Sequence, residues 1–238
     1  MSIITPEGKE GKKFDVQEFY NLPKKVIHCS KCVVSNQRPR ITFDENNVCS
    51  ACRFAEKKNK NTDWKLREKE LEDLLNRHRR KDGYWDVVVP CSGGKDSVYV
   101  AHILKEKYGM NPLTATWAPM LYTDVGWRNL HHMIDSGIDN ILGTPDGKTH
   151  RILTKLSLEI MGDVFQPFIY GQKGFPMAIA INYKIPLVMY GENGEVEYGG
   201  DLKNADVPTH NVTEDMTKHY FSGIHPEDFE KYGIDKKN

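Results

Sequence analysis

The stretch that most constrains the fold is VVVPCSGGKDSVYVAHIL, residues 87–104. Its β-branched start is typical of a strand buried in a parallel sheet. A glycine-rich turn follows and leads into a helical segment that ends at Gly109. This order of elements suits phosphate, because backbone N–H groups at the helix start point at the anion. The Walker spacing is absent, since the earlier glycine is missing and Asp96 follows Lys95. The sequence therefore predicts an α/β domain with a phosphate loop of another kind.

The segments after this loop continue the alternation of strands and helices. Further strands are expected at 113–119, 139–145 and 185–191, with helical patterns between them. Such alternation predicts a doubly wound parallel sheet with helices on both faces. Ligands of these sheets bind beyond the carboxyl ends of the strands. We therefore expect a site formed by the loop at 91–97, by Thr116 and Trp117, and by the segment at 191–200.

Composition sets further limits. The chain has 238 residues, which is enough for one α/β domain and a small appendage. It has no run of eighteen apolar residues, and its first residues lack the apolar region of a secretory signal, so we expect a cytoplasmic protein without a membrane span. Lys and Arg together equal Asp and Glu at 33 each, so no net charge attracts nucleic acid.

Four of the five cysteines form two pairs near the N-terminus. Cys29 and Cys32 are followed, after a sixteen-residue spacer, by Cys49 and Cys52. Each Cys-x2-Cys turn aims two thiolates at one ion, so two turns complete a tetrahedron, as in a zinc ribbon. Within the spacer, RITF is expected to form a short strand and DENN a turn. With four protein ligands the site is structural, and His28 is a bystander. The spacing leaves an iron–sulfur cluster open.

The chain is thus divided into four parts by its composition. The segment TDWKLREKELEDLLNRHRRK, residues 62–81, predicts a helix, either a solvated connection or a basic end that contacts phosphate. The expected parts are 1–60 with the cysteine ribbon, 61–83 with the connecting helix, 84–200 with the nucleotide domain, and 201–238 as a C-terminal extension that is a lid or an incomplete element.

The residues SGGKDS after a strand resemble the PP-loop of the N-type ATP pyrophosphatases, whose fold is the adenine nucleotide α-hydrolase type. The resemblance implies cleavage of ATP between its α and β phosphates. It implies that Lys95 stabilises the departing pyrophosphate and that Asp96 helps to hold Mg²⁺. The residues that it assigns to ATP and pyrophosphate are Ser92, Gly93, Gly94, Lys95, Asp96, Ser97, Thr116, Trp117 and Gly191.

A narrower resemblance covers residues 20–201. The ribbon together with VPCSGGKDS, LYTDVGWRNL, FQPFIYGQKGFP and YGENGEVEYGGD looks like the N-acetyl sugar amidotransferases of bacterial O-antigen and of pseudaminic or legionaminic acid synthesis. The resemblance implies conversion of an acetamido to an acetamidino group on a nucleotide-linked sugar. It also implies ammonia from a separate glutaminase–synthase pair. The chain departs from the family by having Cys91 before the loop serine, where valine is common, and by being shorter.

Several side chains are candidates for the remaining roles. Glu192, Glu195 or Glu197 could bind Mg²⁺ or accept a proton from ammonium, with Glu192 as the catalytic candidate. Cys91 is either a lone nucleophile or a small residue that packs the strand end. Asp124 could contact ribose or metal, and His131 and His132 are structural. The expected sugar-pocket residues are Gln166, Tyr170, Gln172, Glu195, Glu197 and Tyr198.

Two other functions remain open from the sequence. One is a tRNA-modifying PP-loop enzyme, although the neutral net charge and the lack of a cysteine between the third and fourth strands count against it. The other is a module that binds a nucleotide without chemistry. The chain could also form a homo-oligomer, which the sequence does not decide.

Overall fold

The computed structural model describes residues 18, 22–38, 41–192 and 226–234. These residues belong to two compact units, one with the cysteines and one with the sheet, and the chain passes from one to the other within helix α3. Glu195, Glu197 and Tyr198, and most of the expected C-terminal extension, lie outside the described residues. Among the described helices, none combines the length and the apolar character needed to span a membrane.

The larger unit contains a parallel sheet. Its strands are β1 (Val87–Pro90), β2 (Pro112–Trp117) and β3 (Asp139–Gly143), in the order β1-β2-β3. The expected fourth strand is present in the described residues only as a bridge between Val188 and Val88 on the free side of β1. The Val88 N–H donates to Leu187 O at 2.9 Å, and the Met189 N–H donates to Val88 O at 2.9 Å. The predicted α/β fold with a parallel sheet is confirmed.

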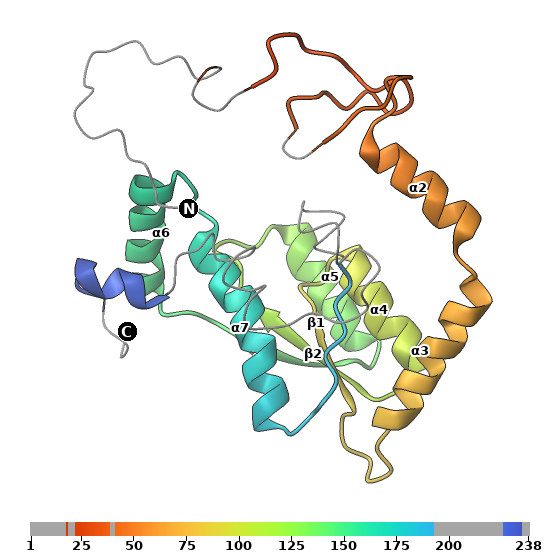
Figure 1. The fold of residues 1–238 in the computed structure, drawn as a ribbon. Coiled ribbons are helices and arrows are strands. Elements are labelled where there is room, and N and C mark those ends of the chain that lie inside the picture. Colours follow the sequence, from red (N-terminus) through yellow and green to blue (C-terminus); the bar gives the residue numbers. More distant parts are fainter. Residues whose placement is uncertain (1–17, 19–21, 39–40, 193–225, 235–238) are drawn as a thin grey trace. The chain divides into compact units, whose positions relative to one another are not determined.

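Helices cover both faces of this sheet, as expected for a doubly wound fold. In Figure 1 the strands lie between α7 (Gln166–Asn182) on one side and α4 (Lys95–Glu106) and α5 (Asp124–Asp135) on the other. Strand side chains alternate between faces. One set therefore forms the core with α7, and the members of this core are Val88, Leu113, Ala115, Ile179, Ala180 and Ile185. The next residues along the strands, such as Thr114 and Thr116, face the other way.

Helix α7 is longer than its sequence pattern predicts. The segment FPMAIAINYK by itself favours a helix from Phe175, but the helix begins at Gln166 and contains Pro176. Glycine and proline usually interrupt helices. Here Gly171 is needed, because a Cβ atom at this position would lie 2.0 Å from Cε2 of Trp117 on β2. Close packing on the sheet thus overrides the local propensity.

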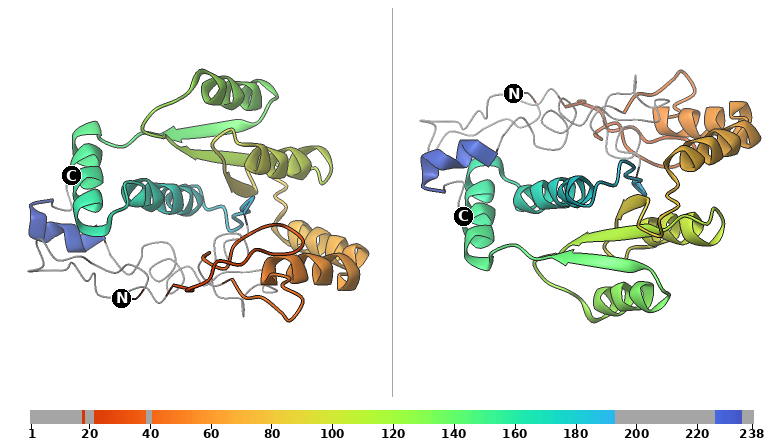
Figure 2. Two further views of the ribbon diagram at one scale, coloured as in Figure 1. Left: turned by 90° about the horizontal axis from the view of Figure 1, so that it is seen from above. Right: turned by 90° about the horizontal axis from the view of Figure 1, so that it is seen from below.

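Two further elements flank the start of α7. Helix α6 (Gly147–Met161) is capped by Asp146, whose side chain accepts hydrogen bonds from Lys148 N and Thr149 N. The short 3-10 helix η3 (Pro226–Tyr232) lies beside α6 in both views of Figure 2 and in Figure 1. Its Phe229 is buried, and the Phe229 ring meets the Tyr170 ring at 6.2 Å.

The smaller unit is built around the cysteines. Two antiparallel bridges, His28 with Ser35 and Phe43 with Cys49, form its turns, so RITF contributes one bridge residue instead of the expected strand. Helix α2 (Ser50–Asn61) follows directly and was not predicted; Cys49 is its N-cap. Helix α3 (Trp64–His78) corresponds to the predicted connecting helix.

Candidate functional site

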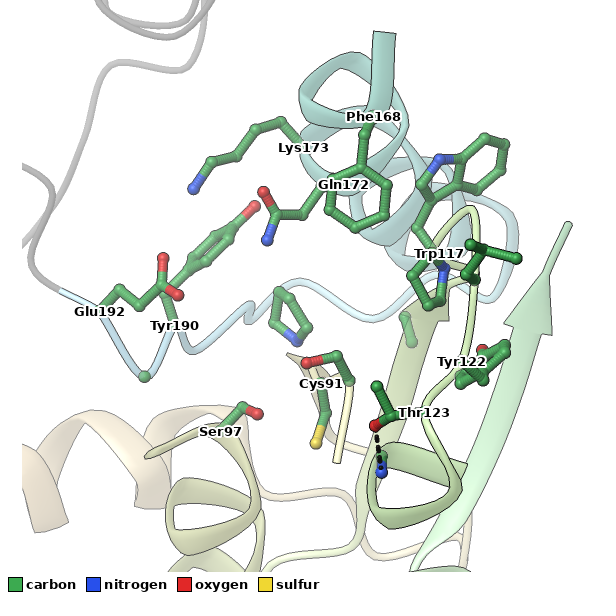
Figure 3. A pocket seen from close by; sticks show the side chains of 17 residues that line it. Cys91, Ser97, Trp117, Tyr122, Thr123, Phe168, Gln172, Lys173, Tyr190 and Glu192 are labelled. Atoms are coloured by element: carbon green, nitrogen blue, oxygen red, sulfur yellow. Dashed lines mark hydrogen bonds between the residues drawn. The ribbon is translucent and has the colours of Figure 1, made fainter. Parts of the chain in front are cut away.

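A cavity of about 310 Å³ lies at the carboxyl ends of β1 and β2 (Figure 3). Its walls come from the loop after β1, the start of α4, the end of β2, the turn before α5, one side of α7 and the segment after Val188. This is the edge at which a parallel sheet is expected to bind its ligand. The predicted residues that line the cavity are Ser92, Ser97, Trp117, Gln172, Gly191 and Glu192.

The two glycines of the loop after β1 have different structural roles. Gly93 has a φ of +85°, and a Cβ atom there would lie 2.8 Å from the backbone nitrogen of Leu130 on α5. Gly94 is the N-cap of α4, and Ser97 Oγ donates a hydrogen bond to its carbonyl at 3.2 Å. The loop is therefore pressed against α5 and places the positive end of α4 beside the cavity.

Gly191 allows the segment after Val188 to close the cavity. A Cβ atom at Gly191 would lie 3.0 Å from the carbonyl carbon of Asp96 and 3.0 Å from the nitrogen of Ser97. The segment thus touches the first turn of α4, backbone against backbone. This contact brings Tyr190 and Glu192 into the wall opposite the loop.

Lys95 and Asp96 do not line this cavity. Their side chains are 87% and 62% exposed, and Lys95 Nζ pairs with Asp96 Oδ1 at 2.6 Å. Consecutive helical residues are about 100° apart, so Lys95 and Ser97 point about 200° apart. Because Ser97 faces the cavity, Lys95 instead lies along a separate groove between α4 and α5, with Tyr99. The roles predicted for Lys95 and Asp96 stay predictions, and neither residue lines the cavity.

Thr116 is buried, and its hydroxyl is used within the sheet. Its Oγ1 donates to Cys91 O and accepts from Asn140 Nδ2 at 2.7 Å. Trp117, the next residue, does line the cavity. Of the two residues predicted at the end of β2, the structure therefore brings only Trp117 to the site.

The three predicted sugar-pocket residues on α7 do not share one face. Gln166 and Tyr170 are one turn apart, whereas Gln172 is about 200° from Tyr170 around the helix. Gln172 lines the cavity, and Gln166 is 1% exposed and bonds to Tyr170. Burial raises the pKa of Tyr170 to about 12, and its ring packs on Phe229. Gln166 and Tyr170 belong to the core beneath η3.

Cys91 is buried at the strand end. Its Sγ lies 3.2 Å from Sδ of Met133 on α5. Burial raises the pKa of the thiol, which keeps it protonated. These features fit the packing alternative better than the nucleophile. Asp124 begins α5, and the His131 ring packs on Trp127 at 4.4 Å.

The sequence analysis did not identify Lys173, a positively charged residue of the cavity. Lys173 on α7 lines it, is 6% exposed, and holds its Nζ 4.7 Å from the centroid of the Tyr190 ring. Burial lowers the pKa of Lys173, and the Glu192 carboxylate opposes this effect. The available signal was a lysine within FQPFIYGQKGFP, an otherwise mostly apolar segment. The lining residues Trp117 and Tyr122 also have buried polar atoms, Nε1 and OH, without a hydrogen-bond partner among the described residues.

The four cysteines form a candidate metal site in the smaller unit. Their sulfur atoms all lie within 4.8 Å of one another, with Cys29 and Cys52 at 3.9 Å and Cys32 and Cys49 at 3.6 Å. Zn–S bonds of about 2.3 Å in a tetrahedron place sulfurs about 3.8 Å apart. An iron–sulfur cluster places iron and sulfide between its cysteines and so needs wider spacing. The arrangement fits a single ion such as zinc.

Backbone donors surround the sulfur of Cys29 and favour its thiolate form. Burial alone would raise the pKa of Cys29, but N–H groups of Cys49, Cys32 and Lys31 outweigh it and lower the pKa to about 6. The Cys52 N–H donates to Cys49 Sγ at 3.4 Å, at the start of α2. His28 takes part in a backbone bridge with Ser35, and the clustered ligand atoms are those of the four cysteines.

The fold and site define an α/β protein with a glycine-rich loop at the carboxyl edge of its parallel sheet and a four-cysteine cluster. No protein-family profile matches the chain. The chain is similar to the uncharacterized protein MJ1599 of Methanocaldococcus jannaschii, with 34% identity over 88 residues. This similarity covers 37% of the present chain and 31% of the archaeal protein, so it shows a distant relationship over a third of each.

Proposed function

We propose that this protein is an ATP-dependent amidotransferase that converts the acetamido group of a nucleotide-linked N-acetyl sugar to an acetamidino group. The observation that carries the proposal is the cavity at the carboxyl edge of the sheet. It joins the glycine-rich loop and the helix start, which suit phosphate, to aromatic walls and a pair of opposite charges. The resemblance of SGGKDS to the PP-loop assigns the phosphate to ATP.

The proposed reaction has two steps. The amide oxygen of the sugar attacks the α-phosphorus of ATP, a new P–O bond forms, and the bond to the β-phosphate breaks with release of pyrophosphate. Ammonia then adds to the imidate carbon and loses a proton, and AMP leaves with the former amide oxygen. The first step is needed because an amide carbon is a poor electrophile until its oxygen becomes a leaving group.

The residues of the cavity suit this sequence of steps. The amides at the start of α4, Ser92 and Ser97 would hold the pyrophosphate. The indole of Trp117, whose Nε1 has no hydrogen-bond partner in the described part of the chain, offers a surface and a donor for a nucleotide base. Glu192 would accept the proton from the attacking ammonium. Asp96 would need to turn from Lys95 to hold Mg²⁺ with the phosphates.

The ammonia and the metal complete the proposal. Ammonia would come from a separate glutaminase partner, as in the family that the sequence resembles. The four cysteines would hold a structural zinc ion, because four protein thiolates leave no open position for a substrate.

The test is release of pyrophosphate from Mg-ATP in the presence of ammonium chloride and a panel of UDP- and CMP-linked acetamido sugars. We expect release that depends on one sugar. By mass spectrometry, the product should be lighter by the difference between an oxygen atom and an NH group. Glu192→Gln should slow product formation, whereas Glu159→Gln on the exposed side of α6 should not. Release that responds to bulk tRNA and to no sugar would refute the proposal in favour of the tRNA-modifying alternative.

A further inference from the structure

Among the described residues that line the cavity, two have charged side chains, Lys173 and Glu192. Lys173 comes from the middle of α7, and Glu192 from the segment that Gly191 holds against α4. In Figure 3 the Lys173 amino group points toward the side of the cavity where the Glu192 carboxylate and the Tyr190 ring lie. The two charges therefore share one wall.

A buried ammonium group needs compensation, because its transfer from water into the protein is unfavourable. Lys173 is only 6% exposed, so much of its hydration is lost. The face of the Tyr190 ring, 4.7 Å from Nζ, supplies part of the compensation. The Glu192 carboxylate also favours the charged form of Lys173, but Glu192 itself is exposed to solvent. A solvated carboxylate is a weak and displaceable partner for such a charge.

The other candidate cation does not serve this cavity. Lys95 follows the glycine-rich loop, where the sequence predicts a phosphate ligand, yet it lies along the groove between α4 and α5. The helix start and Ser97 face the cavity from one side, and Lys173 reaches into it from α7. An anion inside the cavity would thus lie between the positive end of α4 and Lys173.

We propose that Lys173 binds a phosphoryl group of the ligand, and that Glu192 is the counter-charge that this phosphoryl group displaces. The inference rests on the proposed function in taking the phosphoryl group to be that of ATP or of the nucleotide-linked sugar. Ligand binding then breaks the attraction between Lys173 and Glu192. The carboxylate is thus freed before the later step, in which ammonium has to be bound and deprotonated. Lys173 is thus a binding residue, and it also determines when the Glu192 carboxylate becomes free.

The charge exchange predicts effects of opposite sign for the two residues. Lys173→Met keeps the aliphatic volume and removes the ligand for phosphate, so binding should weaken. A hydrogen bond to a charged group is worth about 1.5–3 kcal/mol, which corresponds to a loss of about 10- to 150-fold in affinity. Glu192→Gln removes the competitor, so binding of phosphate should become several-fold tighter, by about the strength of an exposed ion pair. In the Lys173→Met background, Glu192→Gln should have little of this effect.

The experiment is isothermal titration calorimetry of the full chain with inorganic pyrophosphate, ATP, adenosine and a UDP-linked acetamido sugar. The variants are Lys173→Met, Lys173→Arg, Glu192→Gln and the double variant. Lys155→Met, an exposed lysine on α6, is the control for the change in net charge. Circular dichroism verifies folding, and Glu192→Gln, at an exposed residue, keeps the test valid if Lys173→Met does not fold.

We expect the affinity for pyrophosphate and ATP to fall in Lys173→Met and to be mostly kept in Lys173→Arg. The affinity for adenosine should be the same in all three proteins. A loss for the sugar nucleotide and not for ATP would place the sugar phosphates at Lys173 and still support the inference. Equal affinities in the wild type and Lys173→Met would overturn it, as would a wild type that binds none of the phosphates. Phosphate binding that depends on Lys173, in a protein that modifies no acetamido sugar, would sustain the inference and refute the proposed function.

Discussion

Replacement of Gly93 by alanine should destabilise the sheet unit more than any other single methyl addition in the glycine-rich loop after β1. An alanine at a φ of +85° is strained by about 1–2 kcal/mol. Its Cβ would also lie 2.8 Å from Leu130 N and 3.0 Å from Leu130 Cα, which are backbone atoms of α5 that cannot rotate away. Overpacking of this kind costs about 1–3 kcal/mol. The free energy of unfolding should therefore fall by about 2–5 kcal/mol.

Gly94→Ala is the matched control. Gly94 has a φ of −73°, and its Cβ would meet only Ser92 Oγ at 3.7 Å, an ordinary contact. As the N-cap of α4, alanine should cost at most about 1 kcal/mol relative to glycine. Both variants are compared by urea unfolding followed by circular dichroism. Equal losses in the two variants would refute the argument that the loop is pressed against α5.

Three further outcomes are expected. The purified protein should contain bound zinc by elemental analysis, and a strong chelator should reduce its helical circular dichroism, because α2 is capped by a cysteine of the cluster. Gly171→Ala should lower the free energy of unfolding by about 1–3 kcal/mol and alter tryptophan fluorescence, since its Cβ meets the Trp117 ring. Gly174→Ala, with nothing within 4 Å, should be neutral or stabilising by up to about 1 kcal/mol. Burial holds the pKa of Lys173 below its usual value, so the protonated form that binds anions is lost earlier as the pH rises. Calorimetry should show pyrophosphate affinity falling toward alkaline pH in the wild type but not in Lys173→Arg.

The parts of the fold that local patterns determine could be predicted from the sequence. The run at Val87–Pro90 is short, β-branched and apolar on both faces, which suits a buried strand, and the glycines after it indicate the turn. The cysteine spacing was equally informative, because two Cys-x2-Cys turns specify their own geometry. The helix directly after Cys49 was missed because its residues are mostly polar and none of them is buried.

Long-range packing explains what the sequence did not reveal. Gly171 and Pro176 are typical of loops, yet they lie inside α7 because the helix packs closely on Trp117 and the sheet. Once α7 begins at Gln166, its period separates Gln166 and Tyr170 from Gln172. The same period places Lys173, seven residues after Gln166, on nearly the same face as Gln166, and its long side chain reaches the cavity from there. A lysine in an apolar segment is a signal for a buried charge, but only the helix boundaries show where that charge goes.

The distribution of positive charge follows from the geometry of the loop itself. Ser97, in the first turn of α4, lines the cavity, and a helix cannot direct both Ser97 and Lys95 to the same side. A phosphate bound at this helix start therefore receives its amide donors from α4, whereas a side-chain cation that faces it must come from another element. Lys173 on α7 meets that requirement from across the cavity. Because Glu192 follows Gly191, which touches Asp96 and Ser97, the backbone contact with the first turn of α4 also sets the position of the carboxylate near this lysine. A change at Gly191 should thus affect phosphate affinity through both charges, even though the residue has no side chain.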